Sequence, residues 1–203
     1  MKRLLAYLTI ITTLFFLAAV VALLFVAPDL DPMHYGISFY TLTRYGLIIC
    51  AALALVGVSG ISLTIVLWPT IPSVAGRIGL AFLIAWGISS ILAGVFPLDA
   101  TGAVPTLSGS IHNTMGLNFL LVAPAILLIE LTRSRLIAST GFRSSTYWLA
   151  WLLLASVILL FTFNGPFSSL GIGGLVQRLY WIVLALWLIL KARQVLQTKG
   201  TSR

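Results

Sequence analysis

Six apolar stretches, each long enough to cross a lipid bilayer, occupy most of this 203-residue chain. The hydrocarbon core of a membrane requires about 20 apolar residues in a helix, which rises roughly 1.5 Å per residue. By residue number the stretches are 4–27, 45–68, 78–96, 113–131, 146–163 and 174–190. The sequence therefore predicts an all-α fold, a polytopic membrane bundle of six transmembrane helices.

The composition leaves no room for a separate soluble domain. Hydrophobic residues make up 60% of the chain and charged residues only 8%. A soluble domain carries about 25% charged residues. Residues 1–203 are therefore expected to form a single integral membrane domain. The first stretch is longer than a signal-peptide core of about 7–15 residues, so it is expected to remain as a helix.

The basic residues alternate with the spans. With the N-terminus in the cytoplasm, ten of the twelve Lys and Arg fall on the cytoplasmic side, and Arg44 and Arg178 fall outside. The ten are Lys2, Arg3, Arg77, Arg133, Arg135, Arg143, Lys191, Arg193, Lys199 and Arg203. The positive-inside rule predicts a multi-pass protein of the inner (plasma) membrane with both termini cytoplasmic. Basic residues scattered over helix ends argue against nucleic acid as a partner.

Small residues line one face of two spans. Gly87, Ser90 and Gly94 recur at i, i+3 and i+7 in the third span, and Gly57 and Gly60 lie in the second. Small side chains let helix backbones approach closely in lipid. These faces therefore predict a packing seam, with a substrate groove beside them as the alternative.

Most other ionisable residues map to the outer side of the membrane. They are three of the four acids, both histidines and the two outer arginines: Asp29, Asp31, Asp99, His34, His112, Arg44 and Arg178. An ionisable group within a span usually faces a partner inside the bundle. We therefore expect Arg178, beside Gln177 in the sixth span, to pair with Asp99, for which Arg44 is the alternative partner.

The first interpretation of this outer polar network is structural. Asp99, His112 and Arg178 would clamp the third, fourth and sixth spans together, because buried charges must be paired, while His112 satisfies a backbone carbonyl. The protein would then be an accessory or lipid-interacting membrane protein. Its partner is the lipid bilayer, and its size leaves room for a homo-oligomer or a membrane-complex partner.

A second interpretation is catalytic. Ser38, Asp99 and His112 are the residue types of a nucleophile, an orienting acid and a base, as in a hydrolase or transferase acting on outer-leaflet lipid. In a metal-dependent version, His34, Asp31 and His112 are weak candidates for zinc ligands. No spacing matches an established catalytic signature, so neither a metal nor a cofactor is assigned.

A small-molecule transporter is the third interpretation. Transport needs polar groups near the bilayer midplane, often on broken helices. Pro124 and Asn118 in the fourth span are the hints in the sequence, and Pro124 predicts a kink there. Glu130, near the inner end of this span, lies next to Arg133, which predicts a surface ion pair rather than a transport residue.

Four short motifs appear in a set order around the outer ends of the spans. They are Ile37-Ser38-Phe39-Tyr40, Phe96-Pro97-Leu98-Asp99, His112-Asn113 and Gly174-Leu175-Val176-Gln177-Arg178. Together they resemble the six-span prokaryotic membrane family known as domain of unknown function 998. The resemblance covers residues 5–195 approximately. It implies the fold and the membrane location, and it carries no established substrate or catalytic residue.

Overall fold

The computed structural model describes residues 1–136 and 145–197 and is helical throughout its secondary structure. The α-helices are α1 (Lys2–Val26), α2 (Gly46–Leu67), α3 (Val74–Val95), α4 (Leu107–Gly116), α5 (Phe119–Leu136), α6 (Ser145–Asn164) and α7 (Gly173–Gln197). Short 3-10 helices are η1 (Ile37–Leu42), η2 (Trp68–Thr70) and η4 (Ser168–Leu170). Six helical segments within these residues are long and apolar enough to cross a membrane, α4 and α5 sharing the fourth. The predicted six-span all-α fold is confirmed.

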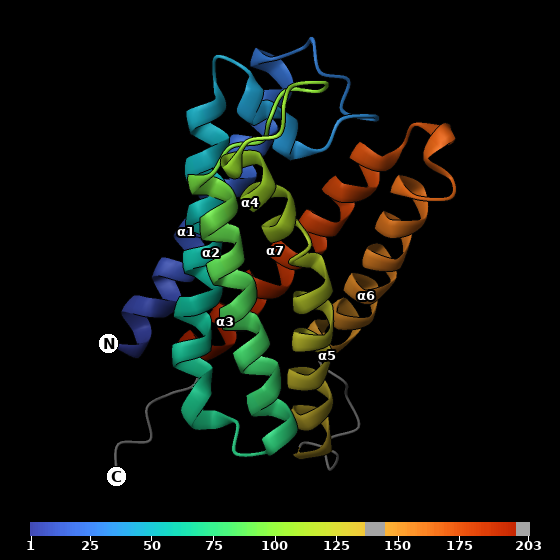
Figure 1. Cartoon of the computed structure of the whole chain (residues 1–203). Helices are drawn as coiled ribbons and strands as arrows, with labels where there is room; N and C mark the ends of the chain where they lie inside the picture. Colours follow the sequence, from blue (N-terminus) through green and yellow to red (C-terminus); the bar gives the residue numbers. More distant parts are fainter. Residues whose placement is uncertain (137–144, 198–203) are drawn as a thin grey trace.

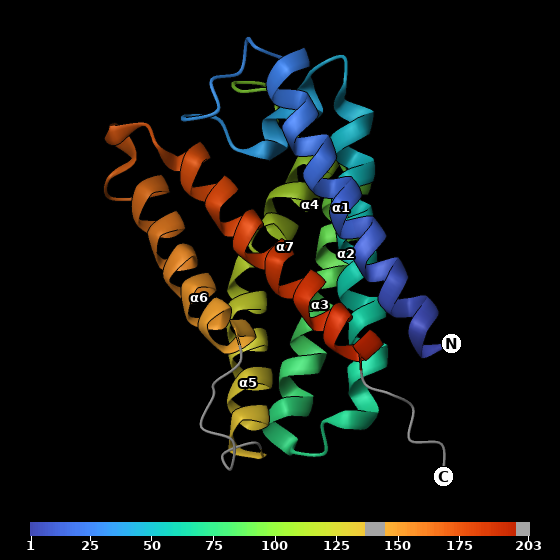
Figure 2. The ribbon, with the colours of Figure 1, turned by 180° about the vertical axis from the view of Figure 1, so that it is seen from behind.

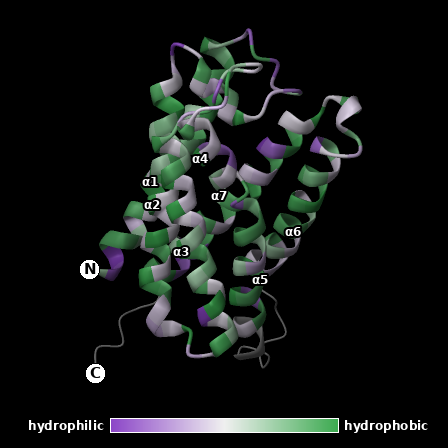
Figure 3. Cartoon of the chain, viewed as in Figure 1, coloured by the Kyte–Doolittle hydropathy of each residue, from purple (hydrophilic) through white to green (hydrophobic). Residues whose placement is uncertain are grey.

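The two ends of the bundle carry different connections (Figures 1 and 2). The segments 27–45, 96–106 and 165–172 lie together at one end, here termed the cap end. The α2–α3 connection, the start of α1 and the end of α7 lie toward the opposite end, termed the terminal end. Hydrophobic residues predominate along the helices between the two ends (Figure 3). An even number of crossings therefore returns the chain to the end at which it began.

The fourth span is interrupted before Pro124 rather than at it. Helix α4 ends at Gly116, and the next two amides make tight i→i−3 bonds, Leu117 to Thr114 and Asn118 to Met115. Glycine is unfavourable inside a helix, which favours the end of α4 at Gly116. The buried Asn118 side chain then donates to Ser90 Oγ of α3 at 3.0 Å. Pro124 lies inside α5.

Helices α2 and α3 pack backbone against backbone. A Cβ atom on Gly57 would lie 2.4 Å from the carbonyl oxygen of Gly87, and one on Gly87 would lie 2.7 Å from that of Gly57. A Cβ on Gly94 would lie 2.4 Å from the carbonyl oxygen of Cys50. Only hydrogen fits at these positions, so the predicted packing seam is confirmed.

The centre of the bundle is aromatic. Phe16 of α1 and Trp86 of α3 both contact Trp181 of α7, with ring centroids 4.6 Å and 6.3 Å away. Phe119, the first residue of α5, packs edge-on against Tyr180 at 4.7 Å. These rings bring α1, α3, α5 and α7 into one buried cluster.

Candidate functional site

Arg178, in the second turn of α7, holds the loop between α1 and α2. Its Nη1 donates to the carbonyl oxygens of Pro32 at 2.7 Å, Tyr35 at 2.8 Å and Gly174 at 3.0 Å. Its Nη2 donates to the Tyr40 hydroxyl at 3.2 Å. The guanidinium is buried. A planar group with several donors suits this cluster of acceptors. Arg178 thereby fastens the segment 27–45 of the cap end to α7.

Gln177 adds a second attachment beside Arg178. Its Oε1 accepts a hydrogen bond from the Ile37 amide at 2.6 Å, at the start of η1. A Cβ on Gly36 would lie 2.6 Å from the same Oε1, and one on Gly174 would lie 2.5 Å from the carbonyl oxygen of Tyr35. The two glycines therefore let the cap loop lie directly on α7.

Asp99 does not meet Arg178, so the predicted ion pair is wrong. Its carboxylate accepts from the Thr106 amide at 2.8 Å and from the Thr106 hydroxyl at 2.7 Å. These bonds lower the pKa of Asp99 below its usual value. Thr106 in turn caps α4 by accepting from the Gly109 amide. Donors within the same loop were available at less ordering cost than a distant guanidinium.

His112 is buried and binds main chain. Its Nδ1 lies 2.9 Å from the carbonyl oxygen of Ala93 and 2.8 Å from that of Phe96. Both partners only accept, so Nδ1 carries the proton. Ala93 lies in the last turn of α3 and Phe96 is the residue that caps its C-terminal end, where helix carbonyls lack partners within the helix. His112 therefore ties α4 to the end of α3.

Of the remaining sequence candidates at the cap end, His34 and Asp31 contact each other, and Arg44 contacts Tyr45. His34 Nδ1 contacts Asp31 at 2.6 Å, and both side chains are exposed. The Met33 amide, and then His34, lower the pKa of Asp31. The Arg44 guanidinium lies 4.7 Å from the ring centre of Tyr45. Across the described ranges no three His, Cys, Asp or Glu residues gather as a metal site.

The proposed catalytic trio is not assembled by hydrogen bonds. Asp99 bonds to Thr106, His112 bonds to the end of α3, and Ser38 accepts from Thr41 through its carbonyl oxygen. No hydrogen bond or ion pair between Ser38, Asp99 and His112 joins these three described residues. Their side-chain contacts therefore lend no support to the catalytic interpretation.

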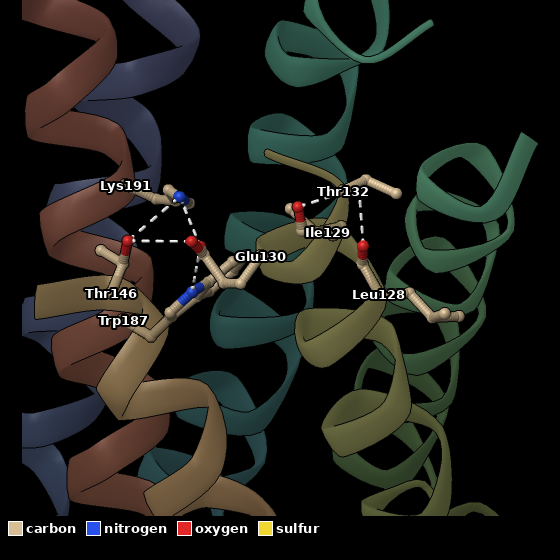
Figure 4. A network of polar contacts seen from close by, with 7 residues as sticks. All are labelled: Leu128, Ile129, Glu130, Thr132, Thr146, Trp187 and Lys191. Atoms are coloured by element: carbon tan, nitrogen blue, oxygen red, sulfur yellow. Dashed lines mark hydrogen bonds and ion pairs between the residues drawn. The ribbon is translucent and has the colours of Figure 1, made fainter. Parts of the chain in front are cut away.

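A buried ion pair joins α5, α6 and α7 near the terminal end (Figure 4). Glu130 is 2% exposed and Lys191 is fully buried, and the Lys191 ammonium contacts Glu130 Oε1. Trp187 Nε1 donates to the same oxygen at 2.9 Å, and the Thr146 hydroxyl donates to Oε2 at 3.1 Å. Lys191 Nζ also donates to the Thr146 hydroxyl at 3.2 Å. Both carboxylate oxygens are therefore bonded.

The location of Thr146 helps to explain why the carboxylate is tolerated there. Thr146 lies in the first turn of α6, where helix amides create a positive end that favours an anion. The Lys191 ammonium lies 5.9 Å from the ring centre of Trp187. Charge, hydrogen bonds and a ring face thus compensate the loss of water around both ions.

A comparison with protein families gives a match that includes both the cap-end contacts and the Glu130–Lys191 pair. The chain matches the family described as "Protein of unknown function (DUF998)" over residues 10–194. It belongs to this family. The match extends from α1 to α7 and confirms the resemblance in the four motifs. No curated protein and no solved structure matches the chain. This DUF998 member is therefore a multi-pass membrane protein with six apolar helices, which place it in a lipid bilayer.

The Glu130–Lys191 pair corrects the sequence interpretation of this DUF998 member. Glu130 was expected at the surface beside Arg133, but it points into the bundle, and the Arg133 side chain lies outside the described residues. The sequence contains a signal for this buried pair. Glu130 is the one acid within the six predicted spans, and Lys191 directly follows the sixth. The fourth and sixth spans end on the same side of the membrane, so Glu130 and Lys191, near those two ends, are expected at a similar depth.

Proposed function

We propose that this DUF998 member is an accessory, lipid-interacting protein of the inner (plasma) membrane, with its terminal end in the cytoplasm. The observation that carries the proposal is the partition of charge between the two ends. Asp29, Asp31 and Asp99 are at the cap end, and the remaining acid, Glu130, is buried against Lys191. No acid is left to offset the exposed cations of the terminal end.

Those cations surround the bundle where lipid headgroups would lie. Exposed basic side chains at the terminal end come from three helices: Lys2 and Arg3 of α1, Arg77 of α3 and Arg193 of α7. Anionic lipids at a cytoplasmic leaflet attract such residues by about 1 kcal/mol per Lys or Arg. This supports contact with anionic headgroups and an N-in, C-in orientation.

The contacts at the cap end, together with those of Glu130, support an accessory role rather than a lipid hydrolase or transferase or a small-molecule transporter. Arg178 and His112 direct their donors at main-chain carbonyls, and Asp99 bonds within its own loop. These contacts support a cap that holds loops in place. Glu130 has both oxygens occupied, which supports a structural pair more than a transport residue.

The proposal is tested in nanodiscs of two compositions, phosphatidylcholine alone and phosphatidylcholine with phosphatidylglycerol. We expect a higher Tm in the nanodisc that contains phosphatidylglycerol, because bound ligand stabilises the folded state. In native mass spectrometry from that nanodisc, we expect the protein to retain more phosphatidylglycerol than phosphatidylcholine. The variant with Lys2→Gln, Arg3→Gln, Arg77→Gln and Arg193→Gln should lose most of the difference. Arg44→Gln at the cap end is the matched control and should keep it. Equal Tm in the two nanodiscs, with no preferential retention of phosphatidylglycerol from the mixed one, would reject the proposal.

A further inference from the structure

One exposed face of the fourth span changes from polar to apolar along its length. On α4 this face carries Ser110, Asn113 and Thr114, and after the interruption it continues through Leu117 and Leu120. Residues three and four apart lie on the same side of a helix. All five are exposed, the two leucines by 54% and 53%. This face is termed the span-four stripe.

The contacts between α4 and α3 fix the depth of the polar part of the stripe. His112 Nδ1 bonds the carbonyl oxygens of Ala93 and Phe96, at the C-terminal end of α3. Helix α3 has 22 residues and is therefore about 33 Å long, close to the roughly 30 Å of a hydrocarbon core. Asn113, the residue after His112, thus lies near the cap-end boundary of that core, where lipid headgroups meet the acyl chains.

The apolar part of the stripe lies deeper. Asn118 donates to Ser90 at 3.0 Å, and Ser90 precedes Val95, the last residue of α3, by about 7 Å of helix. Leu117 and Leu120 flank Asn118 in the chain and are therefore at the depth of the acyl chains. A lipid molecule changes from headgroup to acyl chain in the same direction, so the stripe matches one lipid of the cap-end leaflet.

The polar part of the stripe offers neutral hydrogen-bonding groups. The Thr114 hydroxyl donates to the carbonyl oxygen of Ser110 at 2.8 Å, which leaves its oxygen able to accept. The Ser110 hydroxyl and the Asn113 amide can both donate and accept. The stripe contains no Lys, Arg, Asp or Glu. The Asp99 carboxylate, whose pKa is lowered, lies at the start of α4, and its negative charge would repel a phosphate but not a hydroxyl group.

We propose that the span-four stripe binds a neutral lipid of the cap-end leaflet whose headgroup carries hydroxyl groups, such as a glycosyl diacylglycerol. The headgroup hydroxyls exchange hydrogen bonds with Ser110 and Asn113 and donate to Thr114. One acyl chain lies along Leu117 and Leu120. This site differs from the proposed anionic-lipid contact of the terminal end in its leaflet, its charge and its residues, so the two proposals can fail separately.

The test uses the full chain in nanodiscs that contain phosphatidylcholine, phosphatidylglycerol and monoglucosyl diacylglycerol with the same acyl chains. In native mass spectrometry we expect the wild-type chain to retain monoglucosyl diacylglycerol in preference to phosphatidylcholine. The variant Ser110→Ala with Asn113→Ala keeps good helix formers at both positions. Its preference should fall about tenfold, which corresponds to about 1.4 kcal/mol of binding free energy.

The matched control is Ser168→Ala with Ser169→Ala. This variant removes two exposed hydroxyls at the same end of the bundle, outside the stripe, and should keep the preference. Phosphatidylglycerol retention should be equal in both variants, because its proposed contacts lie at the terminal end. A preference for the glucolipid without one for phosphatidylglycerol would reject the anionic contact and support the stripe, and the reverse result would do the opposite.

A second measurement needs no variant. Monoglucosyl diacylglycerol with a photoreactive group on its acyl chain should label the wild-type chain at Leu117 or Leu120. Labelling confined to other helices would overturn the proposal, as would a glucolipid preference that is absent or is unchanged in Ser110→Ala with Asn113→Ala. A dimer of the wild-type chain that dissociates in the same variant would assign the stripe to a second copy and would also overturn it.

Discussion

At the cap end Arg178 directs its guanidinium at main-chain carbonyls, whereas inside the bundle Lys191 directs its ammonium at the Glu130 carboxylate. The cap residues lie beside exposed loops, where water can reduce the cost of a charge. The Lys191 ammonium lies among α5, α6 and α7, whose main-chain carbonyls are bonded within the helices, and an unpaired ion there would be costly. The comparison teaches that the acceptors left free around a buried cation, loop carbonyls for Arg178 and a side-chain carboxylate for Lys191, decide whether it needs an anion.

The largest expected effect comes from removing one member of the buried pair. Lys191→Met would leave Glu130 as an uncompensated buried carboxylate, and it should lower the free energy of unfolding by about 3–5 kcal/mol. The measurement is chemical or thermal unfolding in detergent. Lys2→Met, an exposed cation of the same end, is the control and should change stability little. Similar small losses of unfolding free energy in Lys191→Met and Lys2→Met would contradict this expectation, because the buried carboxylate would then not need its cation.

Removing both charges should restore much of that loss. The variant Glu130→Leu with Lys191→Met no longer buries an unpaired ion, and replacing buried ion pairs with apolar residues is often neutral or stabilising. Trp187 and Thr146 lose an acceptor, so recovery should be incomplete. The double variant is therefore expected to unfold at a higher Tm than Lys191→Met alone. A Tm at or below that of the single variant would show that the pair has a further role.

Arg178→Met should have an intermediate effect that is localised to the cap. The carbonyls of Pro32 and Tyr35 lose a charged donor, and bonds to charged groups contribute about 1.5–3 kcal/mol. We expect faster proteolysis and faster amide exchange in residues 28–44. Arg178→Lys keeps the charge but has one nitrogen in place of the fork, so it should restore only part of the protection. Unchanged exchange in this loop would contradict the assignment of Arg178 as its anchor.

The smallest effect is a pH dependence of the loop 97–106. Because its pKa is lowered in the folded state, Asp99 stabilises this loop above the usual carboxyl pKa of about 4, and that stabilisation is lost as pH falls through the lowered value. The amide protection factors of the loop, taken relative to the intrinsic exchange rate at each pH, should therefore fall toward pH 3. Asp99→Asn is the matched control and should flatten the profile. An identical pH profile in the two proteins would exclude Asp99 as the source.

Hydropathy predicted the six spans well because each span must satisfy the membrane locally. The predicted second span, 45–68, compares with α2 at Gly46–Leu67, and the fifth, 146–163, compares with α6 at Ser145–Asn164. The fourth span was the exception. Hydropathy is averaged over about 19 residues, so it does not detect an interruption at Leu117 and Asn118, where the chain makes i→i−3 bonds and Asn118 contacts Ser90 of α3.

The candidate site was predicted less well, because partner choice is a property of three-dimensional distance. Arg178 was correctly singled out as an ionisable residue within a span, but its acceptors are carbonyls that no sequence pattern marks. Asp99 found donors in Thr106, its near neighbour in the chain. Spacing along the helix predicts a surface pair between Glu130 and Arg133, whereas the fold brings Lys191 of α7 to Glu130.

The amino-acid sequence alone determined the number of membrane crossings, the partition of basic and acidic residues between the two ends, and the family. Those properties follow from the transfer of whole segments between water and lipid, which depends on composition and order. Only the tertiary structure decided which charges meet, which carbonyls Arg178 and His112 bind, and where the fourth span breaks. Hydrogen bonds act over about 3 Å, and only the packing of the helices brings distant residues that close.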